Sequence, residues 1–331
     1  MIIVTGGAGF IGSAIIWRLN QLGKDDILVV DNLGTDEKWK NLVPLKFHDY
    51  MEKDEFLSLA INQRLAAKLR SDREPIEAII HMGACSSTVE RDATYLIQNN
   101  FEYTKQLAMV AVNEGSRFIY ASSAATYGDG SKGFADDEKH IDRFMPLNMY
   151  GYSKQIFDKW ALWHGLFDRI VGIKYFNVFG PNEYHKGDMR SVVAKAYEQI
   201  KTTGKMQLFK SYREDYRDGE QVRDFIYVKD AVDMTLFFLE NKNVGGLFNV
   251  GSGVANTWNK LASAIFNGLG MPSKVEFVEM PETIRDKYQY RTTADISRIR
   301  RAGYTSPITG LDEAVSDYVR NYLVPGKRLA E

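Results

Sequence analysis

The chain of 331 residues contains 42 lysines and arginines against 43 aspartates and glutamates, so its formal net charge is -1. This balance excludes a broadly basic nucleic-acid-binding protein, although it leaves room for a local anion pocket. Hydrophobic residues make up 44% of the chain and charged residues 26%, which argues against a disordered or fibrous protein.

The residue counts also disfavour metal and membrane proteins. Cys85 is the single cysteine, which excludes an intrachain disulfide and a cysteine-based metal cluster, and the five histidines lack the spacing of a zinc site. No apolar run approaches the ~18 residues of a membrane span. The segment from Met1 to Gly6 begins directly as a strand and does not resemble a signal peptide. We therefore expect a cytoplasmic protein with no metal, no membrane association and no nucleic-acid partner.

Short apolar runs alternate with helical patterns through the first half of the chain. Stretches 13–22 and 99–113 carry apolar residues at helical spacing. Five continuous apolar runs are typical of strands covered on both faces: 2–4, 27–30, 78–80, 118–120 and 170–173. This alternation predicts an α/β protein with a Rossmann-type, doubly wound parallel sheet.

The second half is less regular, and residues 181–223 are polar with few strand signals. We expect strands at 225–228, 247–250 and 275–278, and helices at 230–240, 258–269 and 312–322. The expected Rossmann domain, which would bind the cofactor, comprises residues 1–180 and about 224–250. A smaller, mainly C-terminal α+β substrate domain would comprise about 181–223 and 251–331, so the chain would cross between the two domains more than once.

The loop from Gly6 to Gly12 follows the first expected strand and opens the first expected helix. Glycine at positions 6, 9 and 12 permits a tight turn and lets the backbone approach a pyrophosphate closely. The N-terminus of the following helix offers free N–H groups and a positive dipole end to that anion. A purely structural glycine turn is the alternative, but the strand–turn–helix context favours dinucleotide binding.

The residues beyond this loop leave the choice of dinucleotide open. Asp31 ends the second expected strand, where an acidic side chain usually accepts hydrogen bonds from the adenosine ribose and favours NAD. Lys38 and Lys53 follow at positions that could reach the 2′-phosphate of NADP. Either lysine could equally be an exposed surface charge, so physics alone does not separate NAD from NADP.

A tyrosine and a lysine four residues apart form the catalytic hypothesis. Tyr150 and Lys154 would share one helix face, where the ammonium group would lower the pKa of the phenol from about 10. Such a tyrosine can exchange a proton with a sugar hydroxyl as hydride moves. Tyr152 would point elsewhere on the helix. The spacing also occurs at ordinary helix starts, but Ser123 could hydrogen-bond the reacting oxygen, and Asn99 suits a structural or cofactor-holding role.

These motifs in combination resemble the extended short-chain dehydrogenase/reductase family, in its NAD-dependent epimerase/dehydratase branch. The resemblance covers nearly the whole chain and includes segments 175–181 and 223–230. It implies a Rossmann fold, a bound nicotinamide cofactor and a nucleotide-sugar substrate. Within the family, segments 81–88, 121–128, 146–154 and 185–189 are similar to the ADP-heptose 6-epimerases.

That likeness implies an isomerase acting at C6 of ADP-D-glycero-D-manno-heptose. Transient oxidation and reduction with tightly held NADP would give the L-glycero epimer, which is used in lipopolysaccharide core assembly. The likeness places Lys38 and Lys53 on the side of the NADP phosphate, and this decides our expectation for NADP. It also implies a homo-oligomer, specifically a homopentamer.

The likeness assigns roles residue by residue. The catalytic residues that it implies are Tyr150, Lys186, Ser123 and Lys154. The implied cofactor contacts are Gly6, Gly9, Phe10, Ile11, Gly12, Asp31, Asn32, Lys38, Lys53, Met82, Gly83, Ala84, Cys85, Ser86, Asn99, Lys154, Val178 and Lys186. The implied substrate contacts are Ser123, Asn177, Asp188, Lys195, Phe209, Lys210, Ser211, Tyr212, Arg223 and Tyr288.

Two of these residues have competing interpretations. An epimerase that presents one face of a carbon to the cofactor in each half-reaction needs two acid/base groups, and Lys186 would complement Tyr150 if desolvation lowers its pKa. Without the likeness, Lys186 would be an exposed or phosphate-contacting lysine. The planar guanidinium of Arg223 suits a diphosphate, and its alternative is a structural ion pair with Asp224 or Asp230.

Three other functions compete with the heptose epimerase. Another nucleotide-sugar epimerase, such as a UDP-hexose 4-epimerase, is the nearest alternative. A 4,6-dehydratase is disfavoured because Ala124 and Ala125, rather than an acidic pair, follow Ser123. A non-catalytic dinucleotide-sensing or scaffold protein would not need the intact proton-transfer set of Ser123, Tyr150 and Lys154. Cys85 has no partnered base and is expected to pack in the pocket rather than act as a nucleophile.

Overall fold

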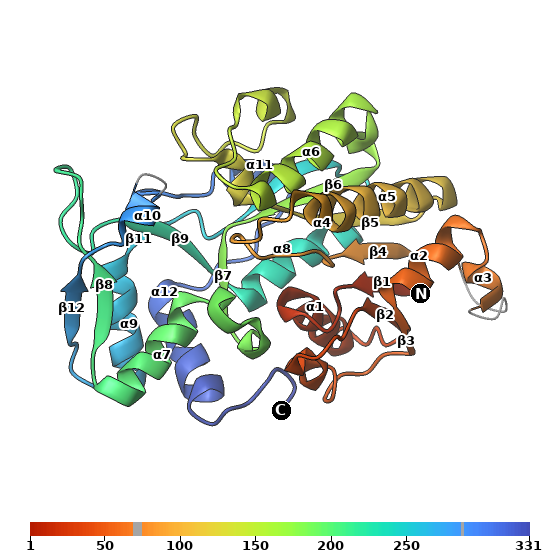
Figure 1. Cartoon of the computed structure of the whole chain (residues 1–331). Helices are drawn as coiled ribbons and strands as arrows, with labels where there is room; N and C mark the ends of the chain where they lie inside the picture. The colour runs from red at the N-terminus through yellow and green to blue at the C-terminus, as the bar shows by residue number, and fades with distance from the viewer. Residues whose placement is uncertain (69–74, 286–287) are drawn as a thin grey trace.

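A seven-stranded parallel sheet forms the centre of the molecule (Figure 1), in a computed structural model that describes residues 1–68, 75–285 and 288–331. Its strand order is β10-β6-β5-β4-β1-β2-β3. The strands are β1 (Ile2–Thr5), β2 (Ile27–Asp31), β3 (Asp49–Glu52), β4 (Ala78–His81), β5 (Arg117–Ser123), β6 (Ile170–Tyr175) and β10 (Gly246–Val250). The order reverses at β1 and β4, as in doubly wound Rossmann folds, and this confirms the predicted fold class.

Both faces of this sheet are buried because side chains along each strand alternate between two cores. Ile2 and Val4 of β1 pack into the core that contains α1 (Phe10–Gln21) and α8 (Val228–Glu240). Ile3 packs on the other side, with α2 (Lys53–Ile61), α5 (Tyr103–Glu114) and α6 (Met149–Trp163). Figure 1 shows α5 and α6 on one side of the sheet and α1 and α8 on the other. Burial on both sides explains the continuous apolar runs that predicted these strands.

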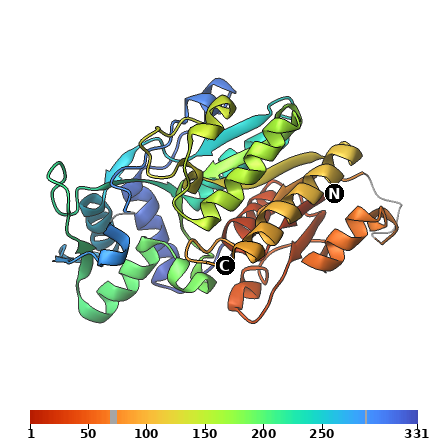
Figure 2. The same ribbon diagram turned by 45° about the horizontal axis from the view of Figure 1, so that its top comes forward.

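Two smaller sheets lie beside the large one. A three-stranded sheet contains β11 (Ala255–Thr257), β9 (Val222–Tyr227) and β7 (Asn177–Phe179), and a two-stranded sheet pairs β12 (Val275–Val278) with β8 (Met206–Phe209). Figure 2 shows the green α7 region at the left, beside several of the blue C-terminal elements and to one side of the large sheet. The division into cofactor and substrate domains stays a prediction.

The polar stretch 181–223 contains more regular structure than its sequence indicates. Helix α7 (Val192–Thr203) buries four short or aliphatic side chains, and its other side chains are half-buried or exposed. Strand β8 follows, with buried Met206 and Leu208 on either side of exposed Gln207. Both elements are amphipathic and short, so their few apolar residues fall below the signal that continuous strands give.

The remaining elements connect and cover these sheets. They include α3 (Leu65–Lys68), α4 (Ala93–Leu96), α9 (Trp258–Leu269), α10 (Glu282–Arg285), α11 (Ser297–Arg301) and α12 (Leu311–Tyr318). Two π-helical turns occur, Ile97–Glu102 before α5 and Val319–Leu323 after α12. Turns of 3-10 helix span Glu37–Asn41, Ala124–Tyr127, Glu138–Arg143, Leu166–Asp168 and Tyr184–Met189. Within the described ranges, none of the helices has the length and apolar character needed to cross a membrane.

Candidate active site

A cavity of about 670 Å³ lies at the carboxyl ends of the central strands. Ligands of doubly wound folds bind in this place because the strand order reverses there and leaves a crevice. The cavity brings together most of the residues that the sequence singled out: Gly6, Gly9, Phe10, Ile11, Gly12, Asp31, Lys38, Met82, Gly83, Ala84, Cys85, Ser86, Ser123, Tyr150, Lys154, Asn177, Val178 and Lys186.

The glycine loop has the geometry of an anion cradle. Gly6 has a φ of +65°, and a Cβ atom there would lie 2.6 Å from the backbone nitrogen of Gly83. A Cβ atom on Gly12 would lie 2.1 Å from the carbonyl oxygen of Gly6. Helix α1 begins after Gly9, which has no side chain to cap the first turn, so backbone N–H groups face the cavity end of the helix. Only glycine fits these contacts, and the residues fit the pyrophosphate of a dinucleotide.

Asp31 occupies the end of β2 and is engaged on both carboxylate oxygens. Its Oδ2 accepts a hydrogen bond of 2.9 Å from the Ala8 N–H, and its Oδ1 accepts one of 2.9 Å from the Lys38 ammonium group. Asn32 donates its backbone N–H to the same Oδ1 at 2.7 Å. Lys38 therefore lies at the cavity wall beside the Asp31 carboxylate rather than out in solvent.

The second lysine of the cofactor hypothesis lies elsewhere. Lys53 donates to the Asn99 Oδ1 at 3.0 Å, and neither residue lines the cavity. The asparagine next along the chain is the buried one. Asn100 accepts from the Cys85 N–H at 2.8 Å, and donates to the Cys85 carbonyl at 2.9 Å and to the Ser153 hydroxyl at 3.0 Å. Asn100 thus ties the cavity wall to α6, a role that the sequence analysis missed.

Helix α6 carries the candidate proton-transfer pair. The side chain of Asn148 caps the helix by accepting the Gly151 N–H at 2.8 Å, which fixes where the first turn begins. Tyr150 and Lys154 both line the cavity, opposite Ser123 at the end of β5. Tyr152 is 45% exposed, so it points away as expected from its spacing. The helix period therefore separates the two tyrosines as predicted.

The electrostatics of this pair differ from the simple expectation. Burial raises the pKa of Tyr150, and the hydrogen bond with Ser123 opposes that rise only in part. Burial lowers the pKa of Lys154 to about 8, against the opposing charge of Asp158. The predicted lowering of the tyrosine pKa is therefore wrong for the protein alone, because desolvation of the phenol outweighs its hydrogen bond with Ser123.

A fully buried ion pair lies beneath the proton-transfer residues. Asp158 follows Lys154 by one helical turn and binds the Lys174 ammonium group at 2.7 Å. It also accepts from the Tyr120 hydroxyl at 2.7 Å and from the Ser122 hydroxyl at 2.8 Å. Lys174 donates in turn to the Thr126 hydroxyl at 2.7 Å. The pair thus joins α6 to β5, β6 and the turn that follows Ser123.

The candidate second base lies on the opposite wall of the cavity. Lys186 belongs to the turn Tyr184–Met189, and its ammonium nitrogen lies 5.3 Å from the centre of the Phe10 ring in the glycine loop. Burial lowers the pKa of Lys186, and the negative charge of Glu183 opposes this effect. The desolvation that a lysine base requires is therefore present, and the merely exposed alternative does not hold.

Arg223 is held between two aromatic rings at the end of the cavity. Its guanidinium carbon lies 5.5 Å from the centre of the Trp258 ring and 5.1 Å from that of Tyr288. The Trp258 Nε1 donates to the Tyr288 hydroxyl at 2.9 Å, so the three side chains form one unit, and Trp258 lines the cavity. Sequence reasoning missed Trp258 because one tryptophan at a helix start is an ordinary core residue.

The alternative role of Arg223, a structural ion pair with Asp224 or Asp230, is not supported by the structure. Across the described ranges, no ion pair to Arg223 is present. Asp224 instead accepts from Ser252, Gly253 and Ala294 backbone groups, and Asp230 accepts from Thr309. Burial lowers the pKa of Arg223, which is the cost of keeping a cation unpaired beside the cavity.

The predicted substrate contacts other than Ser123 and Asn177 lie outside the cavity lining. Asp188 and Lys195 contact each other through the Asp188 carbonyl oxygen, which accepts from the lysine ammonium group at 3.2 Å. In the segment after β8, Lys210 pairs with Glu279 at 2.6 Å. The predicted contacts that do not line the cavity are Asn32, Lys53, Asn99, Asp188, Lys195, Phe209, Lys210, Ser211, Tyr212, Arg223 and Tyr288. Their ligand contacts stay predictions.

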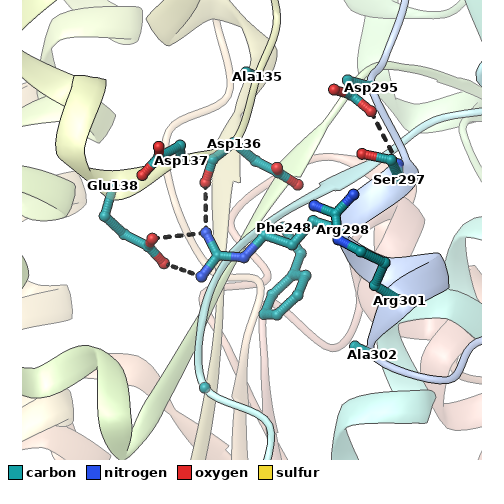
Figure 3. Close-up of a pocket in the computed structure, with 11 residues that line it drawn as sticks. Ala135, Asp136, Asp137, Glu138, Phe248, Asp295, Ser297, Arg298, Arg301 and Ala302 are labelled. Atoms are coloured by element: carbon teal, nitrogen blue, oxygen red, sulfur yellow. Dashed lines mark hydrogen bonds and ion pairs between the residues drawn. The ribbon is translucent and has the colours of Figure 1, made fainter.

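A second cavity, of about 500 Å³, lies along the free edge of β10 (Figure 3). The Asp136 carboxylate accepts a hydrogen bond from the Asn249 N–H at 2.8 Å, and the Glu138 carboxylate accepts one from the Leu247 N–H at 2.8 Å. Both carboxylates thus bind backbone N–H groups of β10 that have no neighbouring strand to bond with in the described part of the chain. Figure 3 shows Arg298 between the Glu138 carboxylate and the Asp136 backbone, to which it donates. This arrangement closes a sheet edge and carries no proton-transfer set, so the first cavity is the candidate active site.

Comparisons with known proteins place the chain among sugar-nucleotide enzymes. The model of the NAD dependent epimerase/dehydratase family matches residues 2–251. The ADP-L-glycero-D-manno-heptose-6-epimerase of Nitratidesulfovibrio vulgaris is 52% identical over 323 residues, which cover 98% of each chain. The protein of the same name from Fusobacterium nucleatum is 46% identical, again over 98% of each chain. The resemblance that the sequence motifs indicated is thereby confirmed.

Solved structures agree with these sequence comparisons. The Helicobacter pylori ADP-L-glycero-D-manno-heptose-6-epimerase superposes with a TM-score of 0.80 at 26% identity, covering 97% of this chain and 95% of that one. The UDP-glucose 4-epimerase of Thermotoga maritima has a TM-score of 0.76 at 24% identity, covering 96% and 97%, which supports the fold. The chain belongs to the NAD-dependent epimerase/dehydratase family, whose members use a nicotinamide dinucleotide.

Proposed function

We propose that this protein is an isomerase that interconverts ADP-D-glycero-D-manno-heptose and ADP-L-glycero-D-manno-heptose at C6. The observation that carries the proposal is the placement of two acid/base candidates, Tyr150 and Lys186, on the wall of one cavity with Ser123 and Lys154. Curated relatives up to 52% identical over nearly the whole chain bear the name of this activity. The cellular role would be the supply of heptose for the lipopolysaccharide core, in the cytoplasm.

NADP is the cofactor that these residues fit best. The glycine loop and the first turn of α1 would hold the pyrophosphate, and Asp31 would bind the adenosine ribose. Lys38 supports NADP over NAD because its ammonium group lies 2.9 Å from the Asp31 carboxylate and faces the cavity, where a ribose 2′-phosphate would meet it. Phe10, Met82 and Val178 supply apolar walls. When bound, the nicotinamide ring supplies an acceptor and then a donor of hydride.

Tyr150 acts on one face of C6. In the oxidation, its phenolate form accepts the proton of the C6 hydroxyl while hydride leaves the same carbon, so the O–H and C–H bonds break, a C=O bond forms and the phenol is restored. Ser123 lies within hydrogen-bond reach of the Tyr150 phenol, and its single hydroxyl donor stabilises the reacting oxygen when that oxygen is bound beside the phenol. Lys154 stabilises the phenolate as a buried cation on the same helix face.

Lys186 acts after the keto intermediate turns. Hydride returns to the opposite face of the planar C6, and the carbonyl oxygen becomes a hydroxyl by taking a proton. In the turned position, that oxygen faces the wall that carries Lys186, whose burial lowers its pKa and so makes its ammonium group a better proton donor. Two acid/base groups on different walls therefore allow both epimers to react with one cofactor face.

The remainder of the substrate needs a site for a diphosphate and a base. Arg223 is buried beside Trp258, and its Nη1 donates to the Val222 carbonyl oxygen at 2.9 Å. Its planar guanidinium suits a contact with a phosphate of the substrate. Asn177 at the start of β7 lines the cavity and contacts the Asp224 carbonyl oxygen at 3.0 Å, which orients its amide. Binding energy from the nucleotide can thereby position C6 for the reaction. Assembly into a homo-oligomer, specifically a homopentamer, is the state that we propose for the working enzyme.

The substrate proposal is tested by parallel incubations followed by NMR. The protein is mixed with ADP-D-glycero-D-manno-heptose in one tube and with UDP-glucose in another, and the epimers are quantified. Conversion of the heptose nucleotide is expected, and conversion of UDP-glucose alone would replace the proposal with a UDP-hexose 4-epimerase. Conversion of neither, with dinucleotide bound, would favour the non-catalytic sensing protein. Mass analysis of the dinucleotide released on denaturation is expected to give NADP, and NAD would refute that part.

A further inference from the structure

We propose that Glu183 is a positioning residue for Lys186: its buried carboxylate closes residues 180–191 into a fixed loop and holds the lysine ammonium group at the cavity wall. This inference deepens the proposed function and rests on the role of Lys186 as the second acid/base group. The relevant observation is that one side chain binds both ends of the loop that carries the lysine.

Four donors converge on the Glu183 carboxylate, which is 0% exposed. Its Oε1 accepts from the Gly180 N–H at 3.3 Å, from the Ser191 hydroxyl at 2.7 Å and from the Tyr318 hydroxyl at 3.0 Å. Its Oε2 accepts from the Ser191 N–H. Gly180 and Ser191 lie on opposite sides of Lys186 in the chain, so this carboxylate closes the loop, and Tyr318 ties the closed loop to α12.

The base of the loop is also fixed to the cofactor side of the molecule. Asn182 is buried and adopts a left-handed backbone with φ of +77°, which is uncommon for a residue other than glycine. Its amide donates to the Ser13 hydroxyl in α1 at 3.0 Å and accepts the Leu329 N–H at 2.9 Å. Its carbonyl oxygen accepts from Asn41 at 3.0 Å. Backbone conformations of this kind persist where surrounding contacts hold them, and they often occur at functional sites.

These anchors define where the lysine side chain can go. Lys186 follows Glu183 by three residues, and its backbone N–H donates to the Glu183 carbonyl oxygen at 3.0 Å. Gly187, with φ of +53°, then reverses the chain, and the Arg190 guanidinium donates to its carbonyl oxygen at 2.9 Å. The turn around Lys186 is therefore short and held on both sides, which leaves the ammonium group above the Phe10 ring.

A carboxylate does more here than an uncharged anchor could. A buried charge is costly unless donors compensate it, and the four donors to Glu183 provide that compensation. Burial raises the pKa of Glu183, and its hydrogen bonds with Ser191 oppose the rise. The negative charge favours the protonated form of Lys186 and so opposes the lowering of the lysine pKa by burial. The charged and titratable groups around this carboxylate are Tyr184, Lys186 and Arg190 on its own loop, and Tyr318 on α12.

The test compares Glu183→Gln with Tyr318→Phe in the full-length protein with its bound dinucleotide. The glutamine keeps the shape of the side chain but removes the charge, whereas the phenylalanine removes one donor and keeps the charge. Epimer formation is followed by NMR over a range of pH, together with dinucleotide content and melting temperature. For Glu183→Gln we expect kcat to fall by about 10- to 100-fold, since small misplacement of a reacting group has effects of this size.

The pH profile separates positioning from mere structural support. In Glu183→Gln the kinetic limb that reports Lys186 should move to lower pH, by about one pH unit, while KM and dinucleotide content change less than about threefold. Tyr318→Phe should leave that limb in place. Wild-type kcat and pH profile in Glu183→Gln, with only a lower melting temperature, would overturn the inference. If Glu183→Gln does not fold, Glu183→Asp replaces it in the test, because aspartate keeps the charge but has a shorter side chain. We expect a lower kcat in Glu183→Asp as well, and a wild-type kcat there would contradict the proposed role of Glu183.

Lys186→Met distinguishes this inference from the function beneath it. Loss of turnover in Lys186→Met, combined with a wild-type profile in Glu183→Gln, would remove the role of Glu183 and leave the two-base reaction standing. Full activity in Lys186→Met would reject Lys186 as an acid/base group whatever Glu183→Gln shows.

Discussion

The buried ion pair under α6 gives a sharp prediction for stability. Asp158 and Lys174 are 0% and 1% exposed, and they lie 2.7 Å apart. Asp158→Asn removes the negative charge but nearly preserves the shape of the side chain. The Lys174 ammonium group would then stay buried, with the Thr126 hydroxyl and a neutral amide as its acceptors. The substitution therefore isolates the charge of the pair rather than its packing.

The expected magnitude follows from the cost of a buried, uncompensated charge. Removal of one partner from a buried pair destabilises a protein by about 3–5 kcal/mol. Unfolding entropy is about 2.1 cal/mol/K per residue, which gives about 0.7 kcal/mol/K for a chain of this length. The melting temperature of Asp158→Asn should accordingly fall by about 4–7 °C. The loss also loosens Ser122 and Thr126 on either side of Ser123, so kcat should fall as well.

Differential scanning calorimetry on three variants tests this reasoning. Asp158→Asn and Lys174→Met each break the pair, whereas the double variant Asp158→Asn/Lys174→Met combines the same two substitutions and leaves neither charge. The double variant should be more stable than the sum of the single effects indicates, because no charge is left without a partner. A melting temperature within 1–2 °C of wild type for Asp158→Asn, on the same scale, or additive losses in the double variant, would refute the account.

Three further predictions concern catalysis, cofactor choice and pH. Tyr150→Phe should reduce turnover by at least about 100-fold with dinucleotide still bound, whereas Tyr152→Phe should leave turnover unchanged; the reverse ranking in NMR assays would remove Tyr150 from the reaction. Lys38→Ala should weaken NADP binding by about 10- to 100-fold and change NAD binding little, as measured by calorimetric titration. Lys40→Ala is the control, since Lys40 pairs with Glu37 on the surface. Burial lowers the pKa of His81 to about 3, so between about pH 6.5 and 3 only the unfolded state binds a proton at this residue. The melting temperature should therefore fall as the pH is lowered through that window. The decrease should be less steep in His81→Asn.

Local patterns in the sequence predicted the parallel sheet and the glycine loop because each signal comes from a few neighbouring residues. The alternation of β1 side chains between two cores requires continuous apolar residues, and Gly6 and Gly12 leave no room for a Cβ atom. Helical spacing likewise placed Tyr150 in the cavity and Tyr152 in solvent. Such inferences need only the period of a helix or strand.

Properties that depend on burial or on distant partners could not be predicted in the same way. Burial of the phenol reversed the expected direction of the Tyr150 pKa, and no local pattern reports that burial. Asn99 and Asn100 are neighbouring asparagines that the sequence alone does not distinguish. In the π-helical turn Ile97–Glu102, only the side chain of Asn100 bonds with Cys85 and Ser153. Glu183 meets Tyr318 across 135 positions of the chain, a contact that requires the folded structure.

The central claim is that hydride leaves C6 of the heptose and returns to the same carbon within one active site. The most direct measurement is incubation of the isolated protein with ADP-D-glycero-D-manno-heptose in D2O, without added dinucleotide, followed by proton NMR. The account predicts conversion to the L-glycero epimer with the C6 proton fully retained. Deuterium at C6 would contradict it, because solvent exchange would mean that proton abstraction from carbon, rather than hydride transfer, inverts the centre.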